Sequence, residues 1–166
     1  MNLRLIFNCL LFFLFGCVWN AAAVDFFAAA QSDAPLEISS RELEVFRQQQ
    51  QSVFTGDVVA QQGDMTLYTD QLTVLFDEQD EVRRIEADGS VRIEDLLRNS
   101  RAERAVFDRE EQTLILSGDA EVVQGDNRIS GDEIILFLDE NRSLVKSNDS
   151  GRVRAVILPE QKPETP

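Results

Sequence analysis

The sequence contains no histidine, two cysteines and one tryptophan among its 166 residues. Both cysteines, Cys9 and Cys17, lie near the N-terminus, so the rest of the chain has neither a thiol nor an imidazole. Nucleophilic catalysis that relies on a histidine base is therefore excluded, and no disulfide framework is expected. Zinc and copper sites are not expected either, because histidine and cysteine are the usual ligands of these metals. We expect no catalytic residues, no metal and no cofactor.

Basic residues are scarce as well. Lys and Arg number 16 against 30 Asp and Glu, which gives a formal net charge of −14. A protein that binds nucleic acid needs a basic surface to displace counterions, so nucleic acid is not expected as a partner. The acidic balance also disfavours adsorption to an anionic bilayer and favours solubility.

The first 23 residues have the layout of a secretory signal peptide. A short basic start is followed by the apolar run 5–19, and the small residues up to Ala23 suit cleavage. The run is about 15 residues long, whereas a membrane span needs about 20. Cleavage after Ala30, a lipoprotein site at Cys17 and a retained membrane anchor are the alternatives. We predict an exported protein.

Segments in which apolar and polar residues alternate recur from residue 36 onward, as in 72–76, 91–93 and 134–138. Alternation with a period of two indicates β-strands that bury one face. The apolar positions are rich in Val, Ile, Leu and Phe, which suit a pleated surface. Helical spacing occurs only in 94–107, and we interpret the second half of that segment as a strand. The chain is therefore predicted to be all-β.

Two segments, 54–64 and 116–126, repeat one pattern at an offset of 62 residues. Each contains Gly-Asp, then Gln-Gly-Asp seven residues later, and then an aspartate fourteen residues after the first glycine. A weaker copy begins at Gly89 and half a copy begins at Gly151. Such self-similarity indicates a repeat architecture. We predict units of about 31 residues that build a folded-over antiparallel sheet with apolar side chains inside.

Three of the four prolines fall in the last eight residues. This composition predicts a disordered tail over 159–166. The predicted organisation is a signal peptide over 1–23, an N-terminal linker over 24–34, one β-domain over 35–158 and the tail.

The order and spacing of these motifs resemble the OstA-like domain of lipopolysaccharide export proteins. The resemblance spans about residues 35–159 and rests on 38–45, 54–58, 62–70, 116–120, 129–134 and 151–159. It implies a V-shaped β-jellyroll in the periplasm that binds lipopolysaccharide through lipid A. It also implies head-to-tail oligomers joined by edge strands, which bridge an inner-membrane LptC-like subunit and an outer-membrane LptD-like assembly.

Three groups of candidate residues follow. Acyl chains are expected in an apolar groove lined by Ile38, Leu43, Val45, Val58, Ala60, Leu67, Leu72, Val74, Phe76, Val91, Ile93, Phe107, Val122, Ile129, Ile134, Leu136, Leu138 and Ile157. Guanidinium groups suit phosphate, so the expected head-group contacts are Arg83, Arg84, Arg101 and Arg104, unless they form a solvated face balanced by neighbouring acids. Assembly through edge strands is expected at Leu36, Ile38, Arg152, Val153, Arg154, Ala155, Val156 and Ile157.

Four alternatives remain open at this point. The chain could be a membrane-anchored LptC-like subunit that retains 5–19, or a structural β-repeat protein with a dry core and no ligand. The carboxylate pair Asp57 and Asp64, or the pair Asp119 and Asp126, could serve in glycoside hydrolysis, although no aromatic sugar platform accompanies them. The same Gly-Asp turns could hold calcium.

Overall fold

The computed structural model describes residues 34–147 and 151–158. The predicted signal peptide, all of the linker except Ala34, and the predicted tail lie outside this part of the chain. No helix in the described ranges is both long and apolar enough to cross a membrane.

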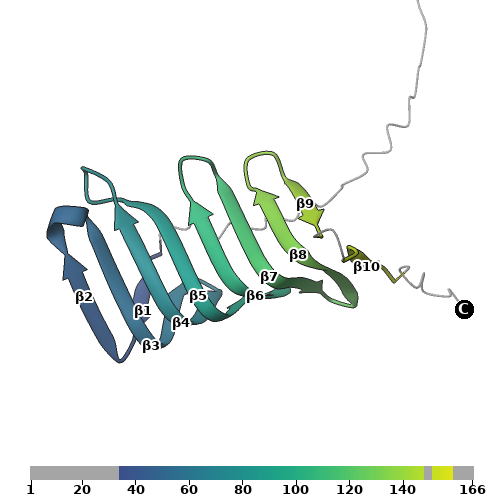
Figure 1. Ribbon diagram of the computed structural model, residues 1–166, viewed down its shortest axis with the longest axis horizontal. Helices are drawn as coiled ribbons and strands as arrows, with labels where there is room; N and C mark the ends of the chain where they lie inside the picture. Colours follow the sequence, from purple (N-terminus) through teal and green to yellow (C-terminus); the bar gives the residue numbers. More distant parts are fainter. Residues whose placement is uncertain (1–33, 148–150, 159–166) are drawn as a thin grey trace, which may run out of the picture.

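The described residues form ten β-strands and one short 3-10 helix (Figure 1). In chain order these elements are β1 Glu37–Ser39, β2 Glu42–Phe46, η1 Arg47–Gln49, β3 Gln51–Gln62, β4 Met65–Phe76, β5 Val82–Glu94, β6 Arg98–Asp108, β7 Thr113–Gln124, β8 Asn127–Phe137, β9 Arg142–Lys146 and β10 Arg154–Val156. All strand pairs are antiparallel, and the strands follow the order β1-β3-β4-β5-β6-β7-β8-β10, with β2 paired to β3 and β9 to β8. The all-β prediction is confirmed. The segment 94–107, which has helical spacing, forms no helix, and its second half lies in β6.

A register shift interrupts each pairing between the long strands β3 to β8. In β3–β4, for example, the ladder jumps from Thr55–Gln71 to Val58–Thr69. Such bulges bend a strand, and the long strands curve side by side (Figure 1). The shifts divide the sheet into two limbs. Limb 1 comprises 37–39, 58–69, 91–102, 120–131 and 154–156, and limb 2 comprises 42–55, 71–88, 104–117 and 133–146.

Glycines occupy the bend on the odd-numbered long strands. Gly118 has a φ of 79° and is followed by Asp119 with a φ of 47°, conformations that L side chains rarely adopt. A Cβ on Gly118 would stand 2.5 Å from the Glu103 carboxylate, and one on Gly89 would stand 2.4 Å from that of Asp70. The acid of β4 or β6 therefore covers the glycine of the following strand, so the acid that ends one repeat unit contacts the glycine that opens the next.

Thr69 stabilises the same bend from inside the sheet. Its side chain is 5% exposed. Its hydroxyl lies 2.9 Å from the Asp88 carbonyl oxygen and 3.0 Å from that of Gly89. Because carbonyl groups freed from the ladder need a partner when they are buried, Thr69 offsets part of the cost of the bulge.

Candidate functional site

The inner face of the sheet is a set of rows of apolar side chains that run across the strands. One row on limb 2 passes from Val74 through Ile85, Phe107 and Leu114 to Leu136, each residue paired with the next. At the bend, Val58, Val91 and Ala120 are at most 2% exposed. The described part of the chain contains no second sheet, so these residues are covered by the limbs of their own sheet.

A cavity of about 390 Å³ lies between the two limbs. Limb 1 contributes lining residues from β3, β4 and β5, and limb 2 contributes residues from β4 to β7 and from the turn between β6 and β7. Leu36, just before β1, and Leu138, just after β8, complete the lining. The lining residues are Leu36, Ala60, Gln62, Met65, Leu67, Leu72, Val82, Ile85, Ala87, Ile93, Ala105, Phe107, Arg109, Gln112, Leu114 and Leu138. Apolar side chains form most of this wall, and its polar members Gln62, Arg109 and Gln112 lie at strand ends. The cavity suits an apolar ligand whose polar part stays near the strand ends.

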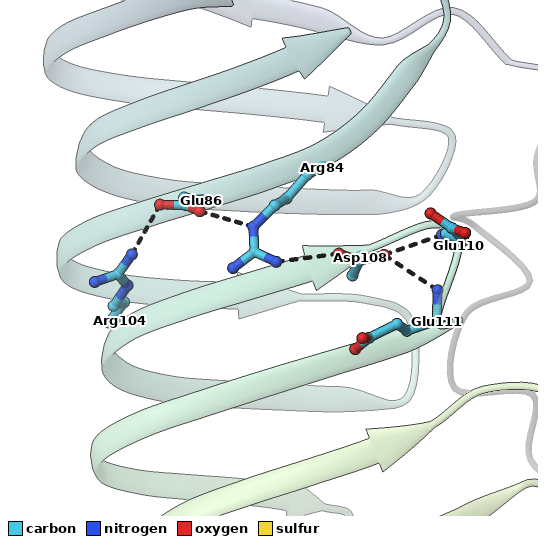
Figure 2. A network of polar contacts seen from close by, with 6 residues as sticks. All are labelled: Arg84, Glu86, Arg104, Asp108, Glu110 and Glu111. Carbon is cyan, nitrogen blue, oxygen red and sulfur yellow. Dashed lines mark hydrogen bonds and ion pairs between the residues drawn. The ribbon is translucent and has the colours of Figure 1, made fainter. Parts of the chain in front are cut away.

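The outer face of limb 2 carries a network of ion pairs instead (Figure 2). The Arg84 guanidinium donates hydrogen bonds to Glu86 at 2.7 Å and to Asp108 at 3.0 Å. Arg104 donates to the second oxygen of Glu86 at 2.8 Å. The hydrogen bond with Glu86 raises the pKa of Arg84 despite an opposing effect of burial. Two of the predicted head-group residues are thus already paired with carboxylates.

Asp108 joins this network to the turn between β6 and β7. Its Oδ1 accepts the backbone N–H groups of Glu110 at 3.0 Å and Glu111 at 3.1 Å. Burial alone would raise the pKa of the Asp108 carboxyl, but these hydrogen bonds and the Arg84 guanidinium outweigh it, so the pKa lies below its ordinary value. The carboxylate is held in its charged form and has a structural role here.

The two ends of the sheet are exposed strands. β1 begins the strand order and β10 ends it, so each has one side without a partner strand in the described residues. The residues around β10 expose apolar surface, with Val153 at 45%, Val156 at 53% and Ile157 at 73%. Open strand edges invite the addition of a further strand.

A family profile described as LptA/(LptD N-terminal domain) LPS transport protein matches residues 37–142. This match covers more than half of the chain, from β1 to the start of β9. The chain belongs to this family of lipopolysaccharide transport proteins. The family is one of transport proteins, which confirms the prediction of a non-enzymatic role in lipopolysaccharide transport.

A solved structure shows the same fold. It is that of LptH, described as the LptA homologous periplasmic component of the lipopolysaccharide transport device from Pseudomonas aeruginosa. The match has a TM-score of 0.67 at 18% sequence identity and covers 76% of this chain and 96% of LptH. No curated protein sequence matches the chain.

The structure divides the predicted groove residues into four groups. Leu67, Leu72, Ile93, Phe107 and Leu138 line the cavity, as does Ala60. Val58, Val74, Val91, Ile134 and Leu136 are buried in the core, and Ile38, Phe76 and Val122 pack against it. Leu43, Val45, Ile129 and Ile157 are instead exposed, at 52%, 59%, 36% and 73%. Leu43 and Val45 lie on the edge strand β2, Ile129 pairs with β10, and Ile157 directly follows β10, so all four lie near an edge of the sheet where few strands cover them.

The predicted polar and edge residues are also placed. Arg83 and Arg101 are exposed and lie on β5 and β6. Leu36 lines the cavity rather than the free edge, and Ile38 pairs with Ala60 and packs against the core. Within β10, Arg154 pairs with Ser130, Ala155 with Ile129 and Val156 with Arg128. Arg152, Val153 and Ile157 flank this strand and are exposed.

Six apolar lining residues were missed from sequence, Met65, Val82, Ile85, Ala87, Ala105 and Leu114, as were the polar Gln62, Arg109 and Gln112. Ile85 and Leu114 belong to the same row as Val74 and Phe107, so the register would have revealed them. The alanines are small and carry little signal in an alternation pattern. Within residues 34–147 and 151–158, no group of three or more His, Cys, Asp or Glu side chains is arranged to hold a metal ion.

Proposed function

We propose that this chain is a periplasmic lipopolysaccharide-binding protein that carries lipid between the inner and outer membranes. The supporting observation is the cavity between the two limbs, about 390 Å³ in volume and lined mainly by apolar side chains. Membership of the lipopolysaccharide transport family supports the ligand, and the periplasmic description of LptH supports the location.

The proposed mechanism is transfer of acyl chains from water to the apolar wall. Each buried CH₂ group contributes roughly 0.8 kcal/mol, so one long acyl chain contributes about 10 kcal/mol before the costs of association. The wall presents side chains of similar character along the rows, such as Ile85, Phe107 and Leu114. Because no position is strongly preferred, lipid is able to move along the groove, and partners supply the direction.

We further propose the finer architecture, a V-shaped β-jellyroll of about 31-residue units. β3, β5 and β7 begin at Gln51, Val82 and Thr113, which lie 31 residues apart. In each of these strands a glycine with positive φ marks the bend. The cavity between the limbs supports the V shape, since both limbs contribute to one wall.

Head-to-tail assembly through β1 and β10 is part of this proposal. The strands alternate in direction across the whole sheet. A second copy whose β1 pairs with β10 and whose β2 pairs with β9 would therefore continue the antiparallel order. When two different edges meet in this way, the chain of copies extends as a filament and does not close into a ring. We propose an LptC-like inner-membrane subunit and an LptD-like outer-membrane assembly as the partners at the two ends.

The exported form and the head-group contacts complete the proposal. We propose removal of residues 1–23 as a signal peptide, which N-terminal sequencing of the exported protein tests.

For the phosphates of the head group we favour Arg83 and Arg101, which are exposed. Arg84 and Arg104 are instead engaged in ion pairs with acidic side chains.

Photo-crosslinking tests the groove. A photoreactive residue at Phe107 faces the cavity, whereas one at the neighbouring Val106 lies on the opposite face of the same strand. We expect ultraviolet light to attach purified lipopolysaccharide at position 107 and at Leu114, with little labelling at Val106 or Ile115. Equal labelling of both faces, or labelling of the outer positions alone, would show that the interior is a dry core.

A further inference from the structure

The turn between β5 and β6 presents two leucines to solvent. Leu96 is 79% exposed and Leu97 is 61% exposed. The corresponding turns on the same side of limb 1, between β3 and β4 and between β7 and β8, consist of Gly63-Asp64 and Gly125-Asp126. The middle turn alone among these three exposes large apolar side chains, which costs solvation free energy unless something covers them.

This turn is firmly held by hydrogen bonds. Asp95 Oδ1 accepts the backbone N–H of Leu97 at 2.7 Å and that of Arg98 at 2.9 Å. The backbone N–H of Asp95 donates to the Arg98 carbonyl oxygen at 2.9 Å. Arg98 itself is 7% exposed, and burial lowers its pKa against the attraction of Asp95. The leucines are therefore held outward by a turn that is anchored in the sheet.

The turn lies at the same end of limb 1 as several residues that line the cavity. Ile93, two residues before the turn, lines the cavity. Gln62 and Met65, which flank the neighbouring Gly63-Asp64 turn, line it as well. The pairs Gln62–Met65 and Thr66–Glu94 place the two turns side by side at the end of limb 1. The exposed leucines therefore lie close in the sheet to apolar residues at this end of the cavity wall.

We propose that Leu96 and Leu97 form a lip on which acyl chains lie where they leave the cavity. This inference rests on the proposed function. A volume of about 390 Å³ is near the lower end for pockets that hold drug-sized ligands, so a lipid with several acyl chains extends beyond it. Insertion of the lip into an anionic bilayer is disfavoured by the net charge of −14 and by the adjacent Glu94.

The first test places a photoreactive residue at Leu96, at Phe107 and at Leu144 in separate copies of the exported protein. Leu144 is the matched control, since it is 38% exposed and lies on the outer face of β9. We expect purified lipopolysaccharide to label positions 96 and 107 but not 144. Labelling at 107 without 96 would overturn the lip and leave the proposed function intact. Labelling at neither position would overturn both.

The second test is the double substitution Leu96→Ser and Leu97→Ser. We expect the Kd for purified lipopolysaccharide to rise about tenfold, since part of the apolar contact is lost. The control Leu144→Ser should leave the Kd unchanged, and circular dichroism checks that both variants fold. An unchanged Kd in the double variant would overturn the lip. So would loss of binding to phosphatidylethanolamine–phosphatidylglycerol vesicles with unaltered lipopolysaccharide affinity, which would assign the turn to a bilayer.

Discussion

At the scale of single residues, the bend of the sheet depends on glycines that an acid side chain covers. Gly118 has a φ of 79°, and an added Cβ would stand 2.5 Å from Glu103 Oε2 and 2.6 Å from its Cβ. Gly118→Ala is expected to lower the free energy of unfolding by about 2–4 kcal/mol, since backbone strain and steric overlap act together. Chemical denaturation followed by circular dichroism measures the change.

Gly125→Ala is the matched control for that substitution. Gly125 has a φ of 57°, but a Cβ there would meet nothing within 4 Å. The loss should therefore be about 1 kcal/mol, from the left-handed backbone alone. Equal losses at both positions would show that the covering acid contributes no strain. Adding Glu103→Ala to Gly118→Ala should recover part of the lost stability.

The Asp108 carboxylate gives the stability a dependence on acid pH. Its pKa is lowered in the folded state from an ordinary value of 3.8. A carboxyl with a lowered pKa stabilises the folded state above its unfolded pKa, and this contribution is lost as the pH falls through the folded value. Asp108→Asn retains an oxygen acceptor for the turn but loses the charge opposite Arg84.

We expect Asp108→Asn to lower Tm by a few degrees at pH 7. The difference between variant and parent should shrink as the pH falls below about 3.8. Differential scanning calorimetry across pH 3 to 7 measures this, with Glu110→Gln as a control, because Glu110 contributes its backbone N–H to the network. A difference that stays constant over this range would show that the charge of Asp108 does not stabilise the fold.

At the scale of strands, alternation predicted the elements but only part of their inner faces. In β7 the inward residues Leu114, Leu116, Ala120 and Val122 keep one parity through the bend, so the pattern can be read along the strand. In β6 the inward residues change from Ser100 and Ala102 to Ala105 and Phe107, because a single extra residue reverses the parity. Partners across the sheet, such as Glu86 for Arg104, depend on this register and could not be predicted from one strand.

The edge strand β10 offers a prediction about assembly. Its three residues are exposed and pair with β8 on one side. A chain that ends at residue 150 should therefore keep its sheet, because β3 to β9 are intact, but should lose end-to-end self-association. Analytical ultracentrifugation over a range of concentrations measures the association, and circular dichroism checks the fold.

A chain that ends at residue 158 is the control for this truncation. It loses 159–166 and keeps β10, so it should associate like the parent. If the chain that ends at residue 150 still forms end-to-end oligomers, β10 is not the assembling edge. If both truncated chains dissociate, the assembling segment lies within 159–166.

At the scale of the whole molecule, the two limbs enclose less volume than a lipid with several acyl chains requires. The cavity measures about 390 Å³, and both limbs line it. The limbs are joined at the bend by buried residues such as Val58 and Ala120, so we expect the bend to act as the hinge if the limbs separate. Loading with lipid should then move the ends of limb 1 away from those of limb 2.

Spin labels on engineered cysteines measure this separation, since the chain has no cysteine beyond Cys17. One label at Asp64 and one at Glu110 report the distance between the limbs, because these exposed residues lie in turns of limb 1 and limb 2. Labels at Asp64 and Asp126 both lie on limb 1 and serve as the control. Lipopolysaccharide should lengthen the first distance and leave the second unchanged, because the hydrogen-bonded rows within a limb do not need to part. If the first distance stays fixed while lipid binds, then the limbs are rigid, and only the lip formed by Leu96 and Leu97 contacts the acyl chains outside the cavity.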